Sequence, residues 1–390
     1  MKIISKSAFT AIVLAGLLCT IAASPARAYP PDPDNAALLY YQGFLSMPQL
    51  SKEAREHLSN VARGKVAPDD KVRQTIDESS GGIHFVEAGV NVPVCQWGIQ
   101  FSEGFDALMP QFAQIRFLAF ALIADARVQA ADGDCRGALE RCLITEKFAL
   151  HVGDDTLISY LVSIAVRDLA YTCMQDIIGQ AAGEVELLQW LKSEFAKSKV
   201  NTLSLIRPMK FEIDSVTELM QMENIKELAR LLADSDEKKM AEIISKTDSK
   251  LLQKARQVYS ERMNSMVEVL ETAMPYEQAY SKLANLAGDL DSSDPTAMAA
   301  RYFIPAINKV FSQKRWIETH NNAVTAAIEI LLDHARTGKL ADSMPAAMPK
   351  DAFSGKDFKY EKTKEGFILH CRGRDLGKDE LYQFEFKLGK

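Results

Sequence analysis

Three features that would place a chain in a broad class are missing here. Basic residues are not in excess, with 46 Lys and Arg against 52 Asp and Glu, and this argues against a nucleic-acid partner because phosphate binding needs clustered cations. Beyond the first 28 residues, no uncharged stretch approaches the roughly 20 residues of a membrane-spanning helix, so we expect no membrane span. With 47% apolar and 25% charged residues, the composition is typical of a globular protein.

Motifs of the common enzymes are also missing. Two histidines one helical turn apart with a nearby glutamate, typical of zinc hydrolases, do not occur, and the six histidines are scattered. Gly-x-Ser-x-Gly, glycine-rich phosphate loops and Cys-x-x-Cys are absent. These absences lower the expectation of an enzyme without removing it, because catalytic residues can be dispersed in sequence. No cofactor is expected.

The N-terminus carries the pattern of an export signal. Lys2 and Lys6 precede an uncharged run over residues 8–23, and Ala26-Arg27-Ala28 fits the small-x-small pattern of a cleavage site. We therefore expect cleavage after Ala28 and a periplasmic or extracellular protein. Its mature chain would hold 43 basic and 52 acidic residues, a net charge of −9.

An exported chain of this kind keeps an odd number of cysteines. They are Cys95, Cys135, Cys142, Cys173 and Cys371. A lipoprotein would instead be acylated at Cys19, but the residue before it is not small, which disfavours that alternative. If residues 134–152 and 156–178 form an antiparallel helix pair, Cys135 and Cys173 lie level, and a disulfide between them is one hypothesis. Buried free thiols are the other.

Helical periodicity dominates the chain up to about Thr337. The predicted N-caps are Ser51, Asp69, Asp294 and either Asp34 or Asn35. From residue 108 to 179 the periodicity is interrupted only by short breaks, which makes successive helices antiparallel neighbours and resembles a tetratricopeptide-type unit. No second copy follows at a fixed period, so a regular solenoid is not expected.

Other segments depart from this pattern or extend it. Residues 79–98, which include Ser-Ser-Gly-Gly, are predicted to be a long surface connection. A seam of apolar residues from Met240 to Ala273 predicts a long amphipathic helix. After Gly338, short aromatic and partly alternating segments predict a small antiparallel sheet, which should dock on the helices because it is too small to be stable alone.

The predicted fold is therefore mainly α, an irregular antiparallel helix-hairpin array with a small C-terminal antiparallel β-sheet. The expected divisions are a signal peptide over residues 1–28, helical units over 29–183 and 184–340, and a β-rich segment over 341–390.

Charges inside apolar helices are the main candidates for a binding site. Arg116, Asp125, Arg127 and Arg167 interrupt runs that otherwise look buried, and a buried charge needs a partner. Arg116 and Arg127 share one helix face, so these arginines could hold a carboxylate or phosphate in a groove. The alternative is that they pair with acidic residues and only orient the helices.

Two resemblances add context. The segments Asn35–Tyr41, Cys95-Gln96-Trp97 and Arg116–Val162 resemble a group of uncharacterised exported bacterial proteins that are mostly helical, which implies architecture and no chemistry. The tail Asp351-Ala352-Phe353-Ser354-Gly355-Lys356, followed by Gly366-Phe367-Ile368-Leu369, is similar to the C-terminal β-segment of type II secretion pseudopilins.

That second resemblance implies a secretion-associated module and a calcium-binding loop. Asp375, Asp379 and Glu380 are the candidate ligands, because calcium prefers oxygen donors. The N-terminus lacks the pilin methylation pattern, which disfavours pilus assembly. Taken together, the sequence favours a protein-interaction or structural module whose partner is another envelope or secreted protein, with an enzyme or small-anion binder as the alternative.

Overall fold

The computed structural model describes residues 31–107, 109–198, 204–221, 249–288 and 294–389. The predicted signal peptide and the first part of the predicted apolar seam, before Ser249, lie outside the described residues. Contacts divide the chain into two units, residues 1–34 and residues 35–390, and the helices and strands belong to the second.

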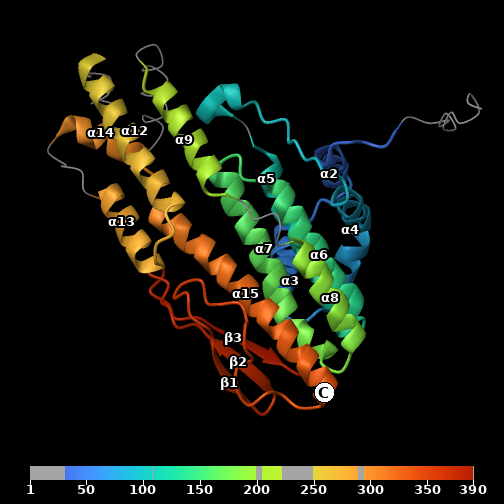
Figure 1. Cartoon of the computed structure of the whole chain (residues 1–390). Helices are drawn as coiled ribbons and strands as arrows, with labels where there is room; N and C mark the ends of the chain where they lie inside the picture. Colours follow the sequence, from blue (N-terminus) through green and yellow to red (C-terminus); the bar gives the residue numbers. More distant parts are fainter. Residues whose placement is uncertain (1–30, 108, 199–203, 222–248, 289–293, 390) are drawn as a thin grey trace, which may run out of the picture. The chain divides into compact units, whose positions relative to one another are not determined.

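The described chain is mainly helical with a small three-stranded antiparallel sheet near the C-terminus, as predicted (Figure 1). The helices are α2 (Ala36–Leu45), α3 (Lys52–Ala62), α4 (Asp70–Gly89), η1 (Phe101–Asp106), α5 (Gln111–Ala131), α6 (Cys135–Val152), α7 (Leu157–Ile177), η2 (Ile178–Ala181), α8 (Val185–Ser198), α9 (Ile206–Leu219), α12 (Ser249–Glu271), α13 (Tyr276–Gly288), α14 (Pro295–Phe303) and α15 (Ile307–Thr337). The strands are β1 (Lys359–Lys362), β2 (Gly366–His370) and β3 (Gln383–Lys387).

Several helices begin where local capping chemistry predicts. The side chains of Asn35, Ser51, Asp69 and Asp294 each accept a hydrogen bond from a backbone N–H in the first turn of α2, α3, α4 and α14. Each cap satisfies one of the donors that a helix leaves free at its start. The predicted N-caps Ser51, Asp69 and Asp294 are thereby confirmed, and of the two candidates for the first helix the cap is Asn35.

The long surface connection predicted over residues 79–98 is wrong in its first half, because α4 continues through the serines and glycines to Gly89. A Cβ added to Gly82 would meet the Gly43 carbonyl oxygen at 3.2 Å, and one added to Gly89 would meet Cε1 of Tyr40 at 2.4 Å. The small residues allow α2 to pack closely on α4, and this tertiary contact outweighs their poor helix propensity.

Helices α5, α6 and α7 are successive antiparallel neighbours (Figure 1). Arg141 of α6 pairs with Asp125 of α5 at 2.7 Å, and Ser163 Oγ of α7 donates to the Ala149 carbonyl of α6 at 2.6 Å. In the part of the chain that the structure describes, Leu157–Ala181 is the one helical stretch long and apolar enough to cross a membrane, and 61% of its apolar window is buried inside the protein. A core helix gives the same signal.

The C-terminal sheet has the order β1-β2-β3, with Tyr360 opposite Leu369 and Phe367 opposite Phe386. It docks on the helices as expected, because β3 contacts α7, η2 and α15, and the Gly389 N–H donates to the Gly179 carbonyl at 2.8 Å. Contacts therefore cross both boundaries expected near residues 183 and 340, since α15 also packs on α7 and α8.

Candidate functional site

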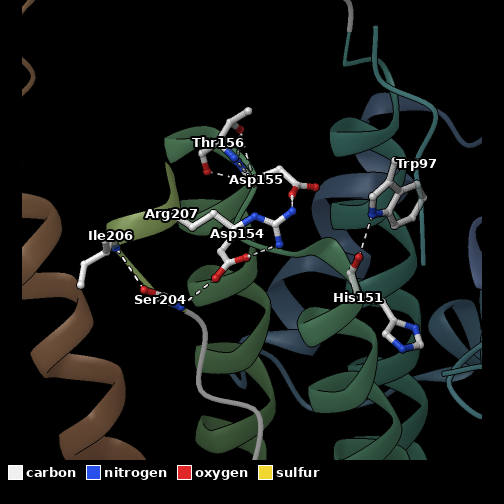
Figure 2. Close-up of polar contacts among 9 residues, drawn as sticks. Trp97, His151, Asp154, Asp155, Thr156, Ser204, Ile206 and Arg207 are labelled. Carbon is white, nitrogen blue, oxygen red and sulfur yellow. Dashed lines mark hydrogen bonds and ion pairs between the residues drawn. The ribbon is translucent and has the colours of Figure 1, made fainter. Parts of the chain in front are cut away.

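A large cavity borders the connection between α4 and η1. Its volume is about 1080 Å³, and it is lined by residues 90–99, by the C-terminal end of α6 and by single residues of α8 and α9. We call it the Trp97 groove. The polar contacts around it are drawn in Figure 2.

The connecting segment is held along one edge by the start of α2. The Val94 carbonyl accepts the first N–H of α2 at 2.8 Å. The Asn35 side chain bonds both backbone groups of Gln96, at 2.8 and 2.9 Å. Bonds from residues 94 and 96 to the same side are what an extended chain gives, because alternate residues present their backbone groups to one side.

The opposite edge of this segment is only partly bonded: the Trp97 carbonyl accepts a hydrogen bond from the Tyr41 hydroxyl of α2 at 2.9 Å. Within the described residues, no hydrogen bond reaches the N–H or C=O of Cys95, or the N–H of Trp97. Both residues line the groove. Free backbone groups on one side of an extended segment are what a strand at a sheet edge offers to another chain.

Trp97 fixes the segment against the helical body. Its indole is only 6% exposed and stacks on Tyr40 and Phe44 of α2, with ring centroids 5.5 and 6.1 Å apart. Its Nε1–H donates to the His151 carbonyl at the end of α6, at 2.7 Å (Figure 2). The segment is therefore held by both α2 and α6.

His151 and Tyr40 meet beneath the groove. The Tyr40 hydroxyl lies 2.5 Å from His151 Nδ1. Burial raises the pKa of Tyr40, so the phenol keeps its proton, and burial lowers the pKa of His151, so the imidazole is neutral at neutral pH and can accept that proton's hydrogen bond.

The Cys95 thiol is not an activated nucleophile. Burial raises its pKa to about 12, and no hydrogen bond joins it to His151 among the described residues. Activation needs a lowered pKa or an adjacent base. The groups that line the groove are therefore suited to binding.

One end of the groove is charged. Arg207 of α9 pairs with Asp154 and Asp155, which follow α6, and Asp154 also accepts the Ser204 N–H at 2.7 Å (Figure 2). Lys147, one turn before His151, also lines the groove and forms no ion pair with a described residue. Its charge contributes to the lowered pKa of Glu194, and it has no closer acidic partner among the described residues, so it can also attract a bound acidic group.

Exposed apolar side chains concentrate beside the groove. Of the nine large hydrophobic residues exposed in the described part of the chain, five lie on α2 or between residues 94 and 101. They are Leu38, Tyr41, Leu45, Val94 and Phe101. A concentration of this kind is more informative than scattered exposed hydrophobics.

The predicted arginines do not share a groove. Arg116 is exposed on α5. Arg127 donates to the Ala62 carbonyl at 2.9 Å and pairs with Asp176 at 2.7 Å. The predicted ligand Asp125 pairs with Arg141. Arg127 and Asp125 therefore hold helices together, which is the alternative that the sequence left open, whereas Arg116 lies on the surface of α5.

Arg167 differs from the other two arginines. It is 9% exposed, its Nη2 donates to the Tyr171 hydroxyl at 2.9 Å, and it lies 3.7 Å from Glu146 of α6. It also lines a separate cavity of about 430 Å³ between α7 and α15, which we call the Arg167 cavity. Of the predicted arginines, Arg167 is the one that lines a cavity.

The predicted Cys135–Cys173 disulfide is not formed, and the five described cysteines are free. Cys135 Sγ lies 3.9 Å from the Ile177 carbonyl, whereas the Cys142 thiol is hydrogen-bonded to Cys173. Cys173 therefore lies level with Cys142, which is seven residues, about two helical turns, from the predicted partner Cys135.

The predicted calcium ligands do not converge. Asp375 is buried and accepts hydrogen bonds from the Tyr382 hydroxyl at 2.9 Å and the Gly377 N–H at 2.8 Å. Asp379 instead pairs with Arg374 at 2.9 Å, and Glu380 forms a backbone bridge with Asp375. Among the described residues, no group of three or more His, Cys, Asp or Glu could hold a metal ion. The burial of Asp375 against the helices gives it a structural role.

No direct signal in the sequence marks the Trp97 groove. Free backbone groups are invisible in a sequence, and Cys95-Gln96-Trp97 stood out only through a resemblance. The cationic residues that join Arg167 around its cavity come from α15, about 150 residues later. No protein-family model, curated protein or solved structure matches this chain.

Proposed function

We propose that this protein is a binding module of the cell envelope or extracellular space, and that it docks an extended segment of another exported polypeptide in the Trp97 groove. The observation that carries the proposal is the set of backbone groups without a hydrogen bond to a described residue, the N–H and C=O of Cys95 and the N–H of Trp97, beside a cavity of about 1080 Å³. An extended peptide can pair with such an edge through main-chain hydrogen bonds, as in β-strand addition.

Side chains around the edge supply specificity. The exposed Val94 and Phe101 offer apolar contacts to alternate side chains of an added strand. Lys147 offers a cation to an acidic side chain of the partner, since it has no ion pair with a described residue. The partner segment is therefore expected to be extended, apolar at alternate positions and acidic at one end.

Site-specific photocrosslinking tests the proposal. A photoreactive amino acid is placed at Val94, at Phe101 or, as the control, at Val66, which is comparably exposed at 43% but does not line the groove. In the exporting cell, we expect the first two positions to give an adduct with the same polypeptide and Val66 to give none. Mass spectrometry of the digested adduct identifies the docked segment.

Hydrogen exchange distinguishes strand addition from other contacts. In the complex with the identified segment, the Cys95 and Trp97 amides should exchange more slowly than in the free protein, because each gains a hydrogen bond. Equal adduct yields at all three positions, or unchanged exchange at both amides, would contradict the proposal.

A further inference from the structure

The Arg167 cavity lies between two helix faces that are more polar than a helix contact requires. On α7, Tyr160, Ile164 and Arg167 are spaced four and three residues apart, so they share one face. The facing stripe of α15 also keeps helical spacing. Its members are Lys314, Arg315, Glu318, Asn321 and Asn322.

Cations outnumber acids in the lining. Lys314 and Arg315 share one carboxylate, that of Glu318, with Arg315 Nη1 at 2.8 Å from it. The charge of Arg167, on the α7 wall, is compensated by Glu146, a buried residue of α6 that does not line the cavity. Two cations against one acid leave about one positive charge on the α15 wall.

Two guanidinium N–H groups in this lining lack a partner. The Nε atoms of Arg167 and Arg315 are buried, and neither has a hydrogen bond to any described residue. Native proteins nearly always satisfy such groups, and a group bound in the cavity is one way to satisfy them. One orphan lies on each helix, and both residues line the same cavity.

We propose that the Arg167 cavity binds a small organic monocarboxylate. A guanidinium presents donors in a plane that matches a carboxylate, and one uncompensated positive charge suits a monoanion. Ile164 and Ile317 supply apolar walls for the organic body, and a volume of about 430 Å³ leaves room for it. This site is separate from the Trp97 groove, because the two cavities share no lining residue.

Calorimetric titration of the mature chain tests the ligand class with three probes: hexanoate, acetate and inorganic phosphate. We expect hexanoate to bind, acetate to bind more weakly because it lacks the apolar body, and phosphate not to compete with hexanoate. The absence of hexanoate binding, or phosphate binding at least as tight, would overturn the assignment.

Matched variants tie binding to the cavity. Arg315→Gln and Lys314→Gln should each weaken hexanoate binding roughly tenfold or more, as expected for a lost charge-assisted contact. Arg336→Gln, an exposed position near the end of the same helix, should leave binding unchanged. Arg167 is left intact because Glu146 is buried beside it. Unchanged binding in both cavity variants, or an equal loss in Arg336→Gln, would contradict the proposal.

Discussion

At the scale of single residues, His151 joins two parts of the Trp97 groove, through its ring to Tyr40 and through its carbonyl to Trp97. Burial lowers the pKa of the ring below its ordinary value of 6.5. The unfolded chain therefore binds a proton at pH values where the folded protein does not, and the stability contributed by the neutral ring is lost as the pH falls through that range.

We expect the free energy of unfolding to decrease between about pH 7.5 and about pH 5, and to decrease less in His151→Gln, which cannot take up this proton. Urea denaturation at several pH values measures both curves. Parallel curves for the two proteins would show that another group is responsible. An NMR titration of the His151 ring supplies the direct check, with a midpoint below 6.5 expected.

Single residues also show how far a binding site can be predicted from sequence. Arg167 was predicted because a charge inside an apolar helix must be satisfied. Its companions Lys314 and Arg315 were not, because an exposed lysine-arginine pair is common on helices and only the packing of α15 on α7 brings them to the cavity. Cys142 was missed as the neighbour of Cys173 for a similar reason, since facing positions depend on how far α7 is displaced along α6.

At the scale of elements, the boundaries that were predicted correctly are those set by local chemistry. The N-caps Ser51, Asp69 and Asp294 depend on a few adjacent residues and were confirmed. The second half of α4 was not predicted, because its glycines are helical only when α2 packs against them. Local propensity and tertiary packing disagree there, and packing prevails.

The contact between α2 and α4 gives a direct test. A Cβ on Gly89 would lie 2.4 Å from Tyr40, whose ring is buried against Trp97 and Phe148 and cannot easily move. We expect Gly89→Ala to lower the free energy of unfolding by about 1–3 kcal/mol, as overpacking does. Urea denaturation measures the loss.

Gly183→Ala is the matched control for that variant. A Cβ at this position meets nothing within 4 Å, so the substitution should be neutral or slightly stabilising. Equal stability of the two variants would mean that α2 and α4 can separate without cost.

At the scale of the whole molecule, residues 35–390 form one compact unit in which the C-terminal sheet is part of the core. The fluorescence of Trp97 reports on the region of α2. The fluorescence of Trp316 reports on the C-terminal sheet, because its ring stacks on Phe384 of β3 with centroids 5.6 Å apart. Two buried carboxylates fasten the tail: Asp351 accepts the N–H groups of Arg372 and Gly373, and Asp375 binds residues of α13 and α15.

Because contacts link these regions, we expect both tryptophans to report the same urea transition. The measurement uses Trp190→Phe combined with either Trp97→Phe or Trp316→Phe, so that one fluorophore remains in each protein. Each pair of midpoints is compared with that from circular dichroism, which follows all helices. A Trp316 transition well before the helical one would show that the tail unfolds separately.

Helix α15 connects the Arg167 cavity to the C-terminal tail. Its 31 residues extend about 46 Å, and the turns between Ser312 and Asn322 are used on both sides. One side faces the Arg167 cavity, which Ala352 of the tail also lines, while Trp316 and His320 on the other side contact Phe384 of β3. A ligand bound in the Arg167 cavity should therefore also stabilise the attachment of the tail to α15. Slower proteolysis of the last fifty residues would then report that the cavity is occupied.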